Sequence, residues 1–402
     1  MEHLTTRHRW TALLALALGG VAIGLTEFVA MGLLPEIARD LLGGTSAGEV
    51  AEAGWTITAY ALGVVAGAPL IAALTARWPR KRLVLILLVL FAAGTAASAL
   101  APTFGLVLVA RFVAALPHGA YFGAAGLLAA SLMGKGKEAR GYAVVLGGLT
   151  LANLAGVPAM TSLGQSAGWR ASYAVIAGVF LLTLLAVAVS VPDLASATAG
   201  SARAELRTLA RPQVWLVAAT AAIGFAGFFA VNSYIAPVTT EVTGLGTGAI
   251  PWVLVAFGLG MTVGNALGGW FADRDLRRAL LFGFSAVIAA ILFFALFADT
   301  TPGLFAGAFL VGGTSLFLGP ALQARLITVA PGAQLMGAAV NQSAMNVANS
   351  IGAALGGLTI ARGLGYLSPA WTGLALSAAG LLLAAVSFAL DRTPARPEEG
   401  VR

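Results

Sequence analysis

The sequence contains no cysteine, and only 10% of its 402 residues are charged. The absence of cysteine excludes disulfides, thiolate metal sites and cysteine nucleophiles, and it leaves the redox compartment open. The shortage of charge excludes a soluble globule, because a chain that is 59% hydrophobic has too little polar surface to cover one. The sequence therefore predicts a membrane protein.

Catalytic motifs are missing as well. The chain has no phosphate-binding loop, no Ser-His-acid set and no paired carboxylates inside a hydrophobic segment. We therefore expect neither an enzyme nor a cofactor, and with only one histidine inside a hydrophobic segment we expect no histidine metal site. Without ATP hydrolysis, the remaining energy source is an ion gradient, which supplies about 2.3 kcal/mol per charge moved through 100 mV.

Long apolar runs dominate what is present. A run of about 20 residues is long enough to cross a hydrocarbon core of roughly 30 Å. Such runs fall at residues 10–34, 54–74, 83–101, 104–132, 139–161, 170–191, 213–236, 249–271, 279–298, 303–329, 335–361 and 367–390. We predict an all-α protein with twelve transmembrane helices.

The net charge of +7 is explained by topology rather than by nucleic-acid binding. If the spans alternate in direction, one side of the membrane receives nineteen of the 23 basic residues: Arg7, Arg9, Arg77, Arg80, Lys81, Arg82, Lys135, Lys137, Arg140, Arg203, Arg207, Arg211, Arg274, Arg277, Arg278, Arg325, Arg392, Arg396 and Arg402. The positive-inside rule then places both termini in the cytoplasm.

The chain is internally duplicated. Gly63 and Gly67 in the second span match Gly260 and Gly264 in the eighth at an offset of 197 residues. Spans five and eleven share a Gly-Ala-Val-Ala-Asn-Gly pattern at an offset of 196. We predict two six-helix halves, residues 1–191 and 212–402, joined by a cytoplasmic linker at 192–211, with a binding site between them near mid-membrane.

Several segments resemble the major facilitator superfamily and, within it, the drug:proton antiporters of the arabinose-efflux and sugar-efflux group. They are TEFVAMGLLPEIA (26–38), AYALGVVAGAPL (59–70), ARFVAALPHGAYFG (110–123), TLANLAGVP (150–158), GLGMTVGN (258–265) and MGAAVNQSAMNVANSIGAALGG (336–357). The resemblance implies two pseudo-symmetric halves in the bacterial inner membrane and a monomeric multidrug exporter that exchanges small molecules for protons by alternating access.

The resemblance also implies conformational roles for Arg77, Arg80, Gly156, Pro158, Asp273 and Arg274. The family has an acidic residue and a glycine in the loop after span two, where this chain has Ala76 and Pro79. The second half keeps Asp273 beside Arg274. Gly156 and Pro158 resemble the antiporter motif with Val157 inserted, which favours export over uptake.

Glu27 is the one carboxylate well inside a hydrophobic run, where a charge costs about 2.5–3.5 kcal/mol and normally faces a cavity. Arg111 lies at a similar depth in span four, roughly 10 Å below its end. His118 follows seven residues later on the same face, just after Pro117. We expect these three residues to couple transport to protons. Alternatively, Glu27 and Arg111 only fix helix packing, and His118 is a hydrogen-bonding residue at a kink.

Neutral polar and aromatic side chains are candidates for substrate binding. Gln342 and Asn346 share one stripe of span eleven with Asn349, because they are spaced i, i+4 and i+7. The candidates are Tyr121, Asn153, Phe228, Asn232, Tyr234, Gln323, Gln342 and Asn346. Amides inside a helix bundle also serve as hydrogen bonds between helices.

The sequence thus predicts a proton-coupled exporter of small uncharged or amphipathic molecules, such as drugs or sugars. One alternative is a facilitator or uptake symporter for sugars or nucleosides, and a remote alternative is a receptor or scaffold without transport. Aligning the Ile-Gly steps of spans one and seven places Gly227 opposite Glu27. Only the first half therefore has ionisable groups where proton coupling needs them.

Overall fold

The computed structural model describes residues 5–75, 78–133, 138–193, 210–330 and 334–391. Within these ranges all regular structure is helical, and twelve helical segments are long and apolar enough to cross a membrane. The predicted all-α class and the predicted twelve spans are confirmed. Arg77 and most of the predicted linker lie outside the described residues.

The first half contains six spans, two of which are interrupted. Its elements are α1 (Thr6–Gly32), α2 (Leu34–Leu41), α3 (Ala47–Ala53), α4 (Trp55–Thr75), α5 (Arg80–Leu100), α6 (Phe104–Ala115), α7 (His118–Met133), α8 (Glu138–Leu151), η1 (Ala152–Gly156), α9 (Val157–Ala167) and α10 (Trp169–Ser190). The fourth span breaks between α6 and α7 at Pro117, as its sequence predicts. The fifth contains a π-helical turn, η1, which was not predicted.

The second half repeats the plan. Its elements are α12 (Pro212–Gly224), α13 (Ala226–Ser233), α14 (Ile235–Pro237), η2 (Val238–Val242), η3 (Thr247–Ala249), α15 (Ile250–Ala272), α16 (Leu276–Phe297), α17 (Thr301–Val329), α18 (Gln334–Ala361) and α19 (Ser368–Leu390). The seventh span is broken twice, at Phe225, which no proline follows closely, and at Tyr234, three residues before Pro237.

Local sequence signals fix where several helices begin. Thr5, Thr103, Thr300 and Asp275 each accept a hydrogen bond from a backbone N–H of the first helical turn. These side chains satisfy donors that have no partner within the helix. Gly168 separates α9 from α10 with φ of 90°, a conformation that favours glycine.

Close helix packing shows the duplication in three dimensions. In the first half, a Cβ on Gly63 would collide with the carbonyl oxygen of Phe112. In the second half, a Cβ on Gly260 would collide in the same way with the carbonyl oxygen of Phe309. Gly63 and Gly260 are 197 residues apart, and so are Phe112 and Phe309. The predicted repeat therefore corresponds to the same helix contact in each half, and glycine makes this close contact possible.

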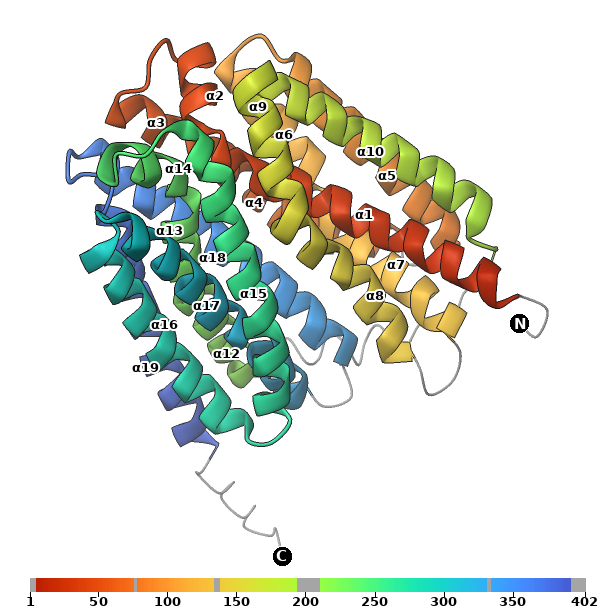
Figure 1. Cartoon of the computed structure of the whole chain (residues 1–402). Helices are drawn as coiled ribbons and strands as arrows, with labels where there is room; N and C mark the ends of the chain where they lie inside the picture. Colours follow the sequence, from red (N-terminus) through yellow and green to blue (C-terminus); the bar gives the residue numbers. More distant parts are fainter. Residues whose placement is uncertain (1–4, 76–77, 134–137, 194–209, 331–333, 392–402) are drawn as a thin grey trace, which may run out of the picture.

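The two halves lie side by side, and the spacing between them changes along the length of the helices (Figure 1). We call the side where α1 begins and α19 ends the terminal side, and the opposite side, near α2 and α14, the far side. The two bundles converge toward the far side and diverge toward the terminal side. On the far side the halves are joined by a hydrogen bond from Gln165 Nε2 to the Thr247 carbonyl (3.0 Å).

Candidate functional site between the two halves

Glu27 lies on α1 where this helix faces the second half. Its side chain is only 5% exposed. Its Oε1 accepts a hydrogen bond of 3.4 Å from Nδ2 of Asn349 on α18. The carboxylate of one half is therefore held by an amide of the other, so any separation of α1 from α18 must break this contact.

Arg111, fully buried on α6, bonds to backbone rather than to the Glu27 carboxylate. Its Nη1 donates to the carbonyl of Thr26 (2.6 Å) and its Nε to the carbonyl of Thr56 (3.4 Å). The guanidinium carbon also lies 4.3 Å from the ring centroid of Tyr60, a cation–π contact. Arg111 thus joins α6 to α1 and α4. On α1 its guanidinium contacts Thr26, the residue directly before Glu27.

His118 is the first residue of α7, directly after the helix break at Pro117, and its ring is buried. Its Nδ1 lies 3.4 Å from the Tyr60 hydroxyl, and its Nε2 lies 3.4 Å from Nε2 of Gln342 in the second half. Tyr60 therefore lies against both Arg111 and His118. His118, like Glu27, therefore contacts α18 of the second half.

The amide stripe of α18 faces the first half. Asn349 contacts Glu27, Gln342 contacts His118, and Nδ2 of Asn346 donates to the Gln342 carbonyl (3.0 Å). The Oδ1 atoms of Asn346 and Asn349 are buried without a hydrogen-bond partner among the described residues. One face of α18 thus presents neutral amides to Glu27 and His118 of the first half.

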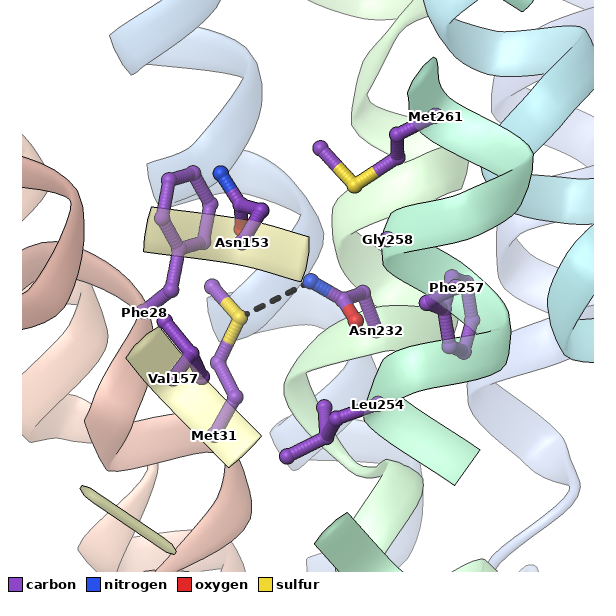
Figure 2. A pocket seen from close by; sticks show the side chains of 9 residues that line it. All are labelled: Phe28, Met31, Asn153, Val157, Asn232, Leu254, Phe257, Gly258 and Met261. Carbon is purple, nitrogen blue, oxygen red and sulfur yellow. Dashed lines mark hydrogen bonds between the residues drawn. The ribbon is translucent and has the colours of Figure 1, made fainter. Parts of the chain in front are cut away.

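A narrow pocket lies beside this network, between α1, η1, α13 and α15 (Figure 2). Asn232 Nδ2 donates a hydrogen bond of 3.0 Å to the sulfur of Met31 on α1, which again joins the halves. Asn153 Nδ2 donates to the carbonyl of Leu149 (3.0 Å) in its own helix. The lining residues are Phe28, Met31, Asn153, Val157, Asn232, Leu254, Phe257, Gly258 and Met261.

The other predicted substrate residues lie elsewhere. The Tyr121 hydroxyl donates to the Leu16 carbonyl (2.8 Å) inside the first half, and the Gln323 Oε1 accepts from Asn341 Nδ2 (2.7 Å) inside the second. Phe228 is buried in an aromatic cluster, 6.2 Å from Phe257 between ring centroids. The Tyr234 hydroxyl donates to the Ala353 carbonyl (2.7 Å).

Tyr234 occupies a joint between the halves rather than the pocket. A Cβ on Gly54 in the first half or on Gly357 in the second would collide with its hydroxyl oxygen. The ring therefore fits between α18 and the junction of α3 with α4 because both positions are glycine. Tyr234 immediately precedes α14, which lies on the far side.

The predicted conformational residues have mixed surroundings. Arg80 begins α5, Gly156 ends the π-helical turn, and Pro158 stands in the first turn of α9. Asp273 follows α15, and the Arg274 guanidinium lies 3.3 Å from the ring centroid of Trp270. In the same loop, Asp275 forms an ion pair with Arg278 (3.2 Å).

The sequence analysis missed several contributors: Thr26, Phe28, Met31, Tyr60, Phe257 and Met261. Met31 follows Glu27 by four residues, which places both on one face of α1 and could have singled it out. Thr26 and Tyr60 contribute through Arg111, and no sequence pattern predicts that contact. Within the described ranges no group of three His, Cys, Asp or Glu side chains gathers in a way that could hold a metal ion.

Comparison with known proteins gives consistent matches over nearly the whole chain. The profile of the Major Facilitator Superfamily matches residues 16–251 and 225–402. The Inner membrane transport protein YdhP of Escherichia coli (strain K12) is 37% identical over 376 residues, which span 93% of this chain and 95% of that protein. The Chloramphenicol resistance protein of Streptomyces lividans is 34% identical over 96% of this chain and 98% of its own length.

Solved structures agree on the fold. The crystal structure of a D-xylose-proton symporter superposes with a TM-score of 0.74 over 94% of this chain and 97% of that one, at 16% identity. The matched family consists of transporters rather than enzymes, and the named inner membrane relative supports a multi-pass membrane location. The resemblance inferred from the sequence motifs is confirmed.

Proposed function

Because the chain belongs to the major facilitator superfamily, we propose that it exports small neutral or amphipathic molecules across the cytoplasmic membrane in exchange for protons. The observation that carries this proposal is the buried Glu27 carboxylate and its hydrogen bond to Asn349 of the opposite half. With both termini cytoplasmic, as the distribution of basic residues favours, the terminal side faces the cytoplasm. The convergence on the far side then corresponds to a conformation closed toward the outside.

The charge on Glu27 sets the strength of the contact between α1 and α18. A hydrogen bond to an ionised acceptor is roughly twice as strong as one between neutral groups. The positive charge of Arg111 also attracts an ionised Glu27, and this attraction is lost on protonation. Ionised Glu27 therefore holds the two halves together, and a proton weakens that hold.

This dependence provides a rule for exchange. In an antiporter the empty, unprotonated carrier must not switch between its two conformations, because such switching allows uncoupled leak. A proton that neutralises Glu27 releases the contact with Asn349, and a bound substrate that displaces neighbouring contacts releases the halves by another route. Each ligand shifts the conformational equilibrium only by its difference in affinity for the two states.

The test is flux in proteoliposomes with an imposed pH gradient, followed with a pH-sensitive dye inside the vesicles. Suitable probes are chloramphenicol, because one relative is named for resistance to it, and a pentose sugar. We expect probe addition to release protons through the wild-type protein and Glu27→Gln to reduce that proton movement to the level of empty vesicles. The variant keeps the shape of the side chain and loses its charge.

The facilitator or symporter alternative has a distinct outcome in the same assay. Wild-type flux that is independent of the pH gradient would exclude antiport, and flux in the same direction as protons would indicate uptake. Asn349→Leu is the matched second variant, because it removes the partner of Glu27 and leaves the carboxylate. We expect it to permit proton leak without probe, since ionised Glu27 then no longer holds α18.

A further inference from the structure

Asn232 is a buried hydrogen-bond donor with a poor partner. Its side chain is 5% exposed, and its Nδ2 donates to the sulfur of Met31 across the interface between the halves (Figure 2). A thioether is a weak acceptor, and a buried amide without a good partner costs free energy. Met31 is also unbranched and flexible, so it can move aside at little cost.

The remaining walls of this pocket are apolar or neutral. Phe28 and Phe257 supply aromatic rings from opposite halves, and Met261 supplies a second thioether. The Asn153 amide donates one N–H to the Leu149 carbonyl, so it contributes a second neutral amide to the pocket. None of the nine lining residues carries a charge.

This lining discriminates between classes of ligand. None of the nine residues that line the pocket is a carboxylate, so a cation there would have no direct partner, which is costly. A sugar carries several hydroxyl groups, and two amides would leave most of them unpaired, so its desolvation would not be repaid. An aromatic ring with one carbonyl or hydroxyl oxygen matches the two phenyl walls and the Asn232 N–H that now points at the Met31 sulfur.

We propose that the contact between Asn232 and Met31 marks the substrate subsite, and that its ligand is a neutral aromatic molecule whose carbonyl or hydroxyl oxygen replaces the Met31 sulfur as the acceptor from Asn232. This inference rests on the proposed export function and narrows its substrate class. The ring of the ligand lies between Phe28 and Phe257, and the Met31 side chain swings out of the pocket.

The same displacement links substrate to proton. Met31 follows Glu27 by four residues on α1, so the two side chains lie one turn apart on one face. This face makes both contacts across the interface, Glu27 with Asn349 and Met31 with Asn232. A proton releases the first contact and the substrate releases the second.

The experiment measures binding rather than transport, with the full-length protein in nanodiscs and ligand-observed NMR titrations against empty nanodiscs. The probes are acetanilide, its hydrocarbon isostere 2-methylallylbenzene, and D-xylose. For the wild-type protein we expect acetanilide to bind about tenfold more tightly than the hydrocarbon, the effect of one buried hydrogen bond. D-xylose is expected not to bind.

Two variants test which residues produce the preference for acetanilide over the hydrocarbon. Asn232→Leu should abolish the difference between acetanilide and the hydrocarbon, whereas Met31→Leu should tighten acetanilide about threefold, because it removes the competing acceptor and keeps the volume. Asn341→Leu is the matched control, since that buried amide donates to Gln323 away from the pocket, and it should leave the preference intact. If Asn232→Leu does not fold, the Met31→Leu titration decides the question alone.

The inference is overturned if acetanilide does not bind, if it binds no more tightly than the hydrocarbon, or if D-xylose binds and Asn232→Leu abolishes that binding. An unchanged preference in Asn232→Leu, or in Met31→Leu where that variant alone decides, would also overturn it. These results are distinguishable from failure of the export proposal, which is decided by the flux of Glu27→Gln and its dependence on the pH gradient.

Discussion

The two halves share one helix plan and differ in what their interiors hold. The first half buries Glu27, Arg111 and His118 within its spans, and all three lie at or near the surface that faces the second half. The second half places neutral amides of α13 and α18 at the same interface. The two halves thus share their helix packing and differ in their polar side chains. At the interface, the first half carries ionisable side chains, and the second half carries neutral amides that form hydrogen bonds with them.

The second half does contain a buried arginine, in a different place. Arg325 near the end of α17 donates to Asp391 and to the Ser387 Oγ (3.0 Å), and Gln213 donates to Asp391 as well (3.0 Å). This cluster joins α12, α17 and α19 on the terminal side, within one half. A buried arginine is therefore common to both halves, but only Arg111 lies beside a carboxylate that contacts the opposite half.

The strongest test of this difference exchanges each arginine for lysine. Lysine keeps the charge but cannot reach the carbonyls of both Thr26 and Thr56, so Arg111→Lys loses charge-assisted hydrogen bonds worth about 1.5–3 kcal/mol each. We expect proton-driven flux in proteoliposomes to fall by about 10- to 100-fold. Arg325→Lys should lower the thermal unfolding temperature and leave the flux of the folded protein within about twofold of wild type. Equal loss of flux in both variants would show that any buried arginine is required and that the halves do not differ.

Packing leaves no room for a side chain at the position that the alignment of the Ile-Gly steps places opposite Glu27. Gly227 lies against α19, where a Cβ would collide with the Ser377 Oγ and the Gly373 carbonyl oxygen. We expect Gly227→Ala to destabilise the protein by about 1–3 kcal/mol, the usual cost of overpacking, measured by thermal unfolding in detergent. The matched control is Gly178→Ala on α10, where a Cβ meets no atom within 4 Å. That change should be neutral or stabilising by up to about 1 kcal/mol, because alanine favours helix. A tolerated Gly227→Ala would mean that the second half has room for a side chain here and that its lack of a carboxylate has another cause.

The fold was predictable from the sequence because hydrophobic length and repeated glycines are local signals. The twelve spans, the break at Pro117 and the equivalence of Gly63 with Gly260 all follow from such signals. The π-helical turn and the breaks at Phe225 and Tyr234 were not predicted. Pro158 directly follows the π-helical turn and Pro237 follows Tyr234 by three residues, so these two features have a proline nearby, whereas the break at Phe225 has none.

Some residues of the candidate site were predictable from the sequence, and their contacts were not. Burial of a charge in a hydrophobic run singled out Glu27 and Arg111, and helical spacing singled out the amides of α18. Which partner each group takes depends on distances between helices that sequence spacing does not encode. Arg111 bonds to backbone carbonyls, the alternative that the sequence left open, and Tyr234 fits a joint between two glycines.

The smallest expected effect concerns an acid on the far side. There, α2 of the first half, which carries Glu36, packs against the apolar α14 of the second half. Glu36 is largely buried, and its Oε2 has no hydrogen-bond partner among the described residues. Burial raises the pKa of Glu36 above its ordinary value of 4.5, against the opposing effects of a backbone hydrogen bond and Arg39. The folded state therefore favours the protonated acid, so this stabilisation is complete below about pH 4.5 and is lost as the pH rises through the raised pKa.

Glu36→Gln, which resembles the protonated acid, should stabilise the protein at neutral pH by less than about 1 kcal/mol and lose that advantage as the pH falls toward 4.5. Thermal unfolding at several pH values measures the difference between variant and wild type. Glu49 provides the opposite case, because its Oε2 accepts a hydrogen bond from the Ser46 N–H (2.8 Å), a contact that is stronger when the acid is ionised. Glu49→Gln should therefore be destabilising at neutral pH and approach wild type in acid. If both variants shift stability in the same direction with pH, burial on α2 does not distinguish the two acids, and the contact between α2 and the second half carries no charge penalty.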